Sequence, residues 1–148
     1  MTRPHLWFVD ATILSALITA EPASEQLLRW LSYGYCNWIT SEISLSLTLA
    51  TLERRGLNLQ QQQACLERLL LVLHHGIGLR PLPLQALQPE RLSRPQRRQL
   101  SPLLALQLHT ALHWRCATVV SEEPALVACA RQEGLHATSL TIAVPQAP

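Results

Sequence analysis

Short apolar runs alternate along this chain with longer segments that have helical periodicity. The first run, His5 to Val9, leads through Asp10 into an amphipathic stretch at residues 11–20. A run of this length is typical of a buried strand, and strands that alternate with helices form parallel sheets covered on both faces. The sequence therefore predicts an α/β fold, a three-layer α/β/α sandwich around a parallel sheet of about five strands.

The later segments repeat this alternation. Further strands are expected at residues 35–40, 78–82, 117–120 and 136–142, and further helices at 27–31, 41–55, 58–75, 100–114 and 124–132. Gly56, Gly76 and Gly134 are placed where helices commonly stop. A length of 148 residues fits one domain, which we place at residues 1–144 with a loose tail at 145–148.

The helix expected at residues 58–75 carries an unusually wide apolar stripe. Leu66, Leu69, Leu70 and Leu73 recur at helical spacing, and Leu71 and Val72 extend the stripe beyond one face. Such a helix is either deeply buried or part of a dimer surface. Because only 15% of the residues are charged and 48% are hydrophobic, we expect a homodimer or another protein partner.

Several sequence features bear on the compartment. Cys36, Cys65, Cys116 and Cys129 are widely spaced and form no CxxC pair, a pattern typical of buried free thiols in a reducing cytosol. The N-terminus lacks the pattern of a signal peptide, and no run of apolar residues is long enough to span a membrane. We therefore expect a cytoplasmic protein that does not contact membranes.

All twelve basic residues apart from histidine are arginines, although the net charge is only +2. Four of them fall in a proline-punctuated segment, at Arg91, Arg94, Arg97 and Arg98. Arginine suits bidentate contacts with phosphate, so RNA is a candidate partner. A solvated segment and a biased base composition explain the same pattern equally well.

Polar residues follow the predicted strands where a parallel sheet places its ligand sites, beyond the strand carboxyl ends. Asp10 follows the first strand, Ser41 and Glu42 follow the second, and Ser121, Glu122 and Glu123 follow the fourth. The start of the helix near residue 100 belongs to the same edge. These positions are the candidate site.

Four segments around these positions resemble the PIN-domain family, which includes VapC-type toxin ribonucleases. The segments are residues 8–17 (FVDATILSAL), 39–43 (ITSEI) with 53–56 (ERRG), 104–112 (LALQLHTAL) and 118–123 (TVVSEE). The resemblance as a whole runs from residue 6 to residue 138. The resemblance implies a site in which clustered carboxylates hold Mg²⁺ or Mn²⁺, and the metal activates a water molecule that cleaves RNA.

Carried over position by position, the resemblance leaves this site incomplete. The first acid of the family falls on Asp10, the only aspartate in the chain, and the last falls on Glu123 or, with a one-residue shift, on Glu122. The two central acids fall on Leu47 and Leu104, which cannot coordinate a metal. The implied catalytic residues are thus Asp10 and Glu123, the implied metal ligands are Asp10, Glu122 and Glu123, and the neighbours are Thr12, Glu42 and Ser121.

Each of these acids also has a structural explanation. Asp10 is placed to cap the helix that begins at Ala11, and Glu42, Glu122 and Glu123 are placed at helix starts, where acids favour the helix dipole. Glu42 cannot replace an acid at position 47, because five helical positions correspond to a rotation of about 500° and leave the two side chains roughly 140° apart.

Two functions from different classes remain. The first is a binding or regulatory module with a PIN-like fold, no nuclease activity and no cofactor. The second is an Mg²⁺- or Mn²⁺-dependent ribonuclease, the toxin of a toxin–antitoxin pair, that uses Asp10, Glu122 and Glu123 in an altered site. Leu47 and Leu104 favour the first.

Overall fold

The computed structural model describes residues 5–19, 37–83 and 100–139. The strands are β1 (Leu6–Val9), β2 (Asn37–Ser41), β3 (Ile77–Arg80), β4 (Thr118–Val120) and β5 (His136–Thr138). The helices are α1 (Ala11–Ile18), α3 (Glu42–Arg54), α4 (Leu59–His75), α6 (Pro102–His113) and α7 (Pro124–Gln132). The helix expected at residues 27–31, the arginine-rich segment and the C-terminal tail lie outside these residues.

The five strands form one parallel sheet in the order β3-β2-β1-β4-β5. Strands β2 and β3 are added on one side of β1, and β4 and β5 are added on the other side. The strand order therefore reverses between β1 and β4. This point is where open parallel sheets place their ligand sites. Residues 10 and 121, which follow β1 and β4, therefore begin the segments beside it.

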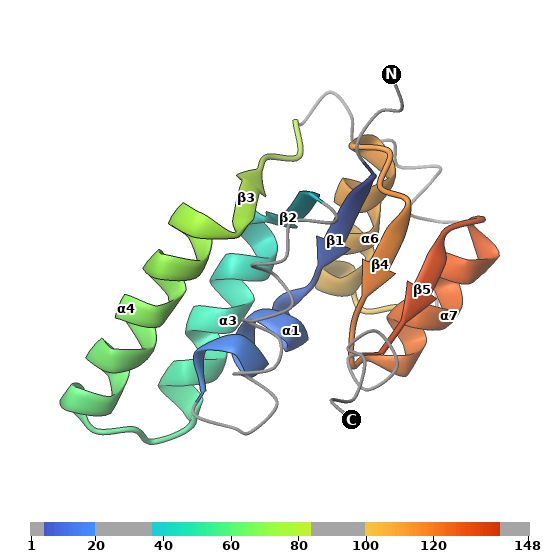
Figure 1. Cartoon of the computed structure of the whole chain (residues 1–148). Helices are drawn as coiled ribbons and strands as arrows, with labels where there is room; N and C mark the ends of the chain where they lie inside the picture. The colour runs from blue at the N-terminus through green and yellow to red at the C-terminus, as the bar shows by residue number, and fades with distance from the viewer. Residues whose placement is uncertain (1–4, 20–36, 84–99, 140–148) are drawn as a thin grey trace, which may run out of the picture.

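Alternate strand residues face two separate hydrophobic cores, as the pleat of a strand requires. Val9, Trp38 and Val120 pack with residues of α1 and α4, whereas Phe8, Ile39 and Val119 pack with residues of α6 and α7. Figure 1 shows α4 at one end of the molecule and α7 at the other. The predicted three-layer sandwich is confirmed.

Helix α3 has a different role from the helices that cover the sheet. It packs chiefly against α1 and also contacts α6 and β2. Ser41 caps its start by accepting a hydrogen bond from the Ser44 amide, at 2.9 Å. This arrangement brings the first turns of α3 to the carboxyl end of the sheet, beside the start of α1.

The structure excludes one of the two alternatives for α4 and corrects the expected burial of one cysteine. Helix α4 is not deeply buried, because Leu66 and Leu70 are 43% and 56% exposed while Leu69 and Val72 enter the core. Cys116 and Cys129 are buried as expected, but Cys65 is only half-buried because it lies at the edge of the α1–α4 contact. No helix in the described ranges combines the length and the apolar character needed to cross a membrane.

Candidate functional site

Asp10 lies fully buried at the end of β1 and caps α1. Its Oδ1 accepts hydrogen bonds from the Thr12 hydroxyl at 2.5 Å and the Ile13 amide at 3.2 Å. Its Oδ2 accepts one from the Ser121 hydroxyl at 2.5 Å. Both oxygens of the only aspartate in the chain are therefore engaged by groups of the protein itself.

The segment after β4 closes over this carboxylate. The Glu122 amide donates to the Thr12 hydroxyl oxygen, and the Glu123 amide donates to the Ser121 hydroxyl oxygen, both at 2.9 Å. Each hydroxyl thus accepts from the backbone of residues 122–123 and donates to Asp10. We call Asp10, Thr12, Ser121 and the amides of Ile13, Glu122 and Glu123 the Asp10 cluster.

Burial raises the pKa of Asp10 above the ordinary value for an aspartate, because removal from water disfavours the charged form. The hydrogen bonds from Ser121, Thr12 and the Ile13 amide lower the pKa again, but they offset only part of the rise. Asp10 consequently holds its proton to a higher pH in the folded protein than in the unfolded chain.

This shift makes a prediction about Asp10→Asn. The carboxyl group of an unfolded aspartate loses its proton near pH 4, whereas that of Asp10 in the folded protein loses it at a higher pH. Between these two pH values the free energy of unfolding falls as pH rises, because ionisation favours the unfolded chain. The asparagine variant lacks this titration. We therefore expect the free energy of unfolding of Asp10→Asn, relative to the native protein, to increase as pH is raised across that window.

Urea unfolding of both proteins at a series of pH values measures this difference and cancels the contributions of the other carboxyl groups. A difference that stays constant with pH, or that decreases as pH rises, contradicts the raised pKa.

A second polar cluster joins three helices next to Asp10. The Oε1 of Gln107, on α6, accepts hydrogen bonds from the Ala11 amide at 3.0 Å and from the Ser44 hydroxyl at 2.7 Å. The Ser44 hydroxyl is also 2.7 Å from that of Ser41. We call Ser41, Ser44 and Gln107 the Gln107 cluster; it connects the first turns of α1 and α3 to α6.

The nitrogen of the Gln107 side-chain amide, unlike its oxygen, is left without a hydrogen bond in the described part of the chain. Gln107 is fully buried, and in the described part of the chain its Nε2 has no hydrogen-bond partner. A buried donor without a partner is costly, so such atoms in folded proteins call for an explanation. Here the amide is oriented by its oxygen, which takes both available donors.

Gln107 was not among the site residues predicted from the sequence. The signal was present, because Gln107 is the one amide in the otherwise apolar stretch 103–108, and a helix that is apolar on every side is buried. A glutamine in such a helix must find buried partners. Which partners it finds depends on how α1 and α3 approach α6, and residue spacing does not carry that information.

Comparison with known proteins found no matching family model and no matching curated protein. Among solved structures, the chain is similar to the Pyrobaculum aerophilum protein PAE2754, with a TM-score of 0.66 and 17% identity over 95% of this chain and 93% of that one. It is also similar to Mycobacterium tuberculosis VapC20, described as a sarcin-ricin loop cleaving toxin, with a TM-score of 0.62 and 19% identity over 82% and 93% of the two chains.

A PilT N-terminus domain protein from Sulfolobus solfataricus is similar over 97% of this chain and 96% of its own, with a TM-score of 0.56 and 12% identity. The chain has the PIN-domain fold. The resemblance noted in the sequence segments thus agrees with the three-dimensional arrangement, and both place Asp10 at the carboxyl end of the sheet.

Within this PIN-like fold, the two leucines lie close to the polar clusters. Leu104 is one helical turn before Gln107 on α6, and Leu47 is one turn after Ser44 on α3. Both leucines are half-buried, and Leu104 packs against the core between the sheet and α6. Their positions therefore fit side chains that pack beside the site.

The glutamates of the PIN-like site are more peripheral than Asp10. Glu42 and Glu122 are exposed, and Glu123 is half-buried. Glu42 is the first residue of α3, and Glu123 precedes Pro124 of α7 without making a side-chain capping bond. The structure brings the backbone of Glu122 and Glu123 to the Asp10 cluster, and it places Glu42 on the surface of the same edge.

The donor set does not match a carboxylate-bound divalent ion. In the described ranges, no three side chains of His, Cys, Asp or Glu lie close enough together to hold a metal. Hard ions such as Mg²⁺ prefer several oxygen ligands with some anionic charge, whereas Asp10 is buried among hydroxyl and amide donors. The residues present at this edge therefore do not fit the metal of the PIN family.

Proposed function

We propose that this PIN-like protein acts as a binding or regulatory module without nuclease activity. The observation that carries the proposal is the full burial of Asp10, whose two oxygens accept three hydrogen bonds from Thr12, Ile13 and Ser121. A ligand to a catalytic metal needs an oxygen that is directed at the ion. Here the same oxygens join the start of α1 to the segment after β4.

The Gln107 cluster supports the same proposal. Its amide oxygen crosslinks α1 and α3, at the edge where clustered carboxylates would repel one another in the absence of a metal. Neutral hydrogen bonds and leucine side chains need no ion to balance their charge. We therefore propose that these residues hold α1, α3 and α6 together and bind no metal.

A second candidate is an Mg²⁺- or Mn²⁺-dependent ribonuclease, the toxin of a toxin–antitoxin pair in the cytoplasm. In its favour, the hydrogen bonds from the Glu122 and Glu123 amides hold both residues at the Asp10 edge. One structural neighbour, VapC20, is described as a toxin that cleaves the sarcin-ricin loop. This candidate requires the carboxylates of Glu122 and Glu123 to bind the ion together with Asp10.

Cleavage of RNA distinguishes the two candidates. We expect the purified protein to leave single-stranded and structured RNA intact in the presence of Mg²⁺ or Mn²⁺, because its buried carboxylate holds no metal. Gel analysis of labelled RNA is the measurement, with Asp10→Ala as the matched control for contaminating nucleases. Metal-dependent cleavage by the native protein that disappears in Asp10→Ala contradicts the proposal.

A binding module needs a surface, and the exposed leucines of α4 are the candidate. Leu59, Leu66 and Leu70 project along one side of α4, where they are 83%, 43% and 56% exposed. Exposed apolar groups of this size in a row are typical of protein contacts. We propose that α4 contacts a second copy of the chain or another protein.

We expect an oligomer in light scattering at tens of micromolar protein. Leu66→Gln with Leu70→Gln should shift it to the monomer, since both changes remove apolar area from the contact. Leu103→Gln is the control, because Leu103 is 47% exposed on α6, away from this side of α4. A native protein that is monomeric at this concentration is the result that rules out self-association.

A further inference from the structure

Three exposed leucines of α4 form one continuous face of that helix. Leu59, Leu66 and Leu70 are 83%, 43% and 56% exposed. They lie within about 40° of one another around the helix axis, because consecutive residues of an α-helix are about 100° apart. We call these three residues the leucine face. It extends over about 16 Å of the helix.

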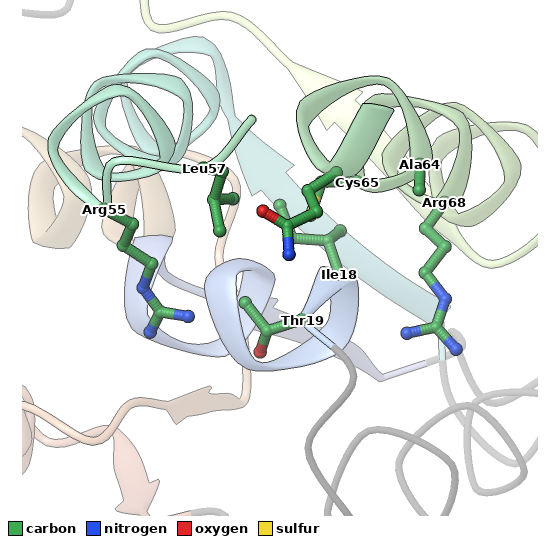
Figure 2. Close-up of a pocket in the computed structure, with 8 residues that line it drawn as sticks. Ile18, Thr19, Arg55, Leu57, Ala64, Cys65 and Arg68 are labelled. Atoms are coloured by element: carbon green, nitrogen blue, oxygen red, sulfur yellow. The ribbon is translucent and has the colours of Figure 1, made fainter. Parts of the chain in front are cut away.

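Helix α4 meets α1 through a different side. Figure 2 shows a pocket between the two helices, which is lined on α4 by residues that include Ala64, Cys65 and Arg68. Around the helix axis these three residues lie, on average, roughly 180° from the leucine face. Figure 1 shows α4 at one end of the molecule. The leucine face is therefore open to a partner.

The charges of α4 indicate what kind of partner this face fits. Apart from its histidines, α4 has two charged residues, Glu67 and Arg68, and neither belongs to the leucine face. Arg68 lies on the pocket side, whereas Glu67 lies about 80° around the helix from the centre of the leucine face. A face without charge gives a charged partner nothing to complement, but a second copy of the chain supplies an identical apolar face.

We propose that two copies of the chain pair through the leucine face, with their α4 helices antiparallel and a two-fold axis beside Leu70. This inference rests on the proposed role of α4 as a contact surface. Residues equally distant from position 70 on its two sides then lie level with one another. Leu70 packs against Leu70 of the second copy, and Leu66 lies within about 1.5 Å, along the axis, of the half-buried Leu73 of the second copy.

Glu67 favours this orientation and this position of the axis. Parallel helices would place the two Glu67 side chains next to each other, and like charges in contact are unfavourable. An antiparallel pair centred on Leu66 would still leave them only about 3 Å apart along the helix axis. An axis beside Leu70 increases this separation to about 9 Å. Glu67 then lies beside Leu73 and His74 of the second copy, neither of which is acidic.

Disulfide cross-linking of Leu70→Cys and Leu66→Cys tests the orientation. The Cα atoms of a disulfide lie about 4.4–6.8 Å apart. Two residues at position 70 face each other across the axis, whereas two at position 66 are about 12 Å apart along it. After mild oxidation we expect Leu70→Cys to give at least about tenfold more linked dimer, with the disulfide between the two introduced cysteines identified by mass spectrometry. Equal linking in both variants, or none in either, overturns the inference.

Charged variants at position 70 test whether the partner is a second copy. In light scattering, Leu70→Glu and Leu70→Arg should each be monomeric, and their equimolar mixture should form dimers, because glutamate then meets arginine at the axis. The same two changes at Leu71, which is 60% exposed but about 100° around the helix from Leu70, are the control and should leave the dimer intact. A mixture that stays monomeric, or equal dissociation of the Leu71 variants, overturns the inference. The proposed lack of nuclease activity is tested separately by RNA cleavage.

Discussion

We expect Gln107→Ala to lower the free energy of unfolding by about 2–4 kcal/mol, in the range for a buried cavity combined with a lost buried hydrogen bond. The alanine removes the acceptor of the Ala11 amide and of the Ser44 hydroxyl. The hydroxyl retains Ser41 as a neighbour, but the amide loses its side-chain acceptor. The connection between α6 and the starts of α1 and α3 is broken at the same time.

Chemical unfolding of the native protein and the variant measures this loss. The matched control is Gln132→Ala, because Gln132 is an exposed glutamine at the end of α7 and its replacement should change stability by less than about 0.5 kcal/mol. If Gln107→Ala is no more destabilising than Gln132→Ala, the Gln107 cluster does not hold the three helices together.

Acidic residues at positions 47 and 104, where the PIN family has acids, should also lower the stability of the fold. Leu104→Asp should lower the free energy of unfolding by roughly 1–3 kcal/mol, because it removes apolar packing and adds a half-buried carboxylate one helical turn from Gln107. Desolvation and repulsion by neighbouring acids should raise the pKa of the new carboxyl group. The double variant with Leu47→Glu should lose more.

Mg²⁺ or Mn²⁺ should restore part of the stability of the double variant, since a ligand that binds only the folded state stabilises it by mass action. Thermal unfolding with and without metal is the measurement. Leu103→Asp is the control, because Leu103 is exposed on the same turn of α6 and a carboxylate there should show neither the loss nor the metal effect. If the double variant is as stable as the native protein and metal changes nothing, Leu47 and Leu104 are not the acid positions.

Local patterns in the sequence predicted most of the fold. The strand that ends at Val9, the cap at Asp10 and the left-handed glycines at 56 and 134 all lie where spacing and turn chemistry placed them. These features depend on neighbouring residues, which is why they can be read along the chain. The parallel sheet was predicted from the alternation of strands and helices, whereas the strand order β3-β2-β1-β4-β5 was not predicted.

The candidate site could be predicted only in outline. The position of Asp10 followed from its strand, but its hydrogen bond with Ser121 joins residues 111 positions apart in sequence. The Gln107 cluster likewise joins side chains 63 positions apart. The burial of α4 was left open by its wide stripe, because the sequence does not say which leucines face α1 and which face outward.

We propose that Asp10 connects the start of α1 to the segment after β4 and holds no catalytic metal. Calorimetric titration of the native protein and of Asp10→Asn with Mg²⁺ and Mn²⁺ measures whether a metal binds there. We expect no saturable heat of binding in either protein. Micromolar binding of either ion by the native protein that is lost in Asp10→Asn contradicts it and favours the metal-dependent ribonuclease.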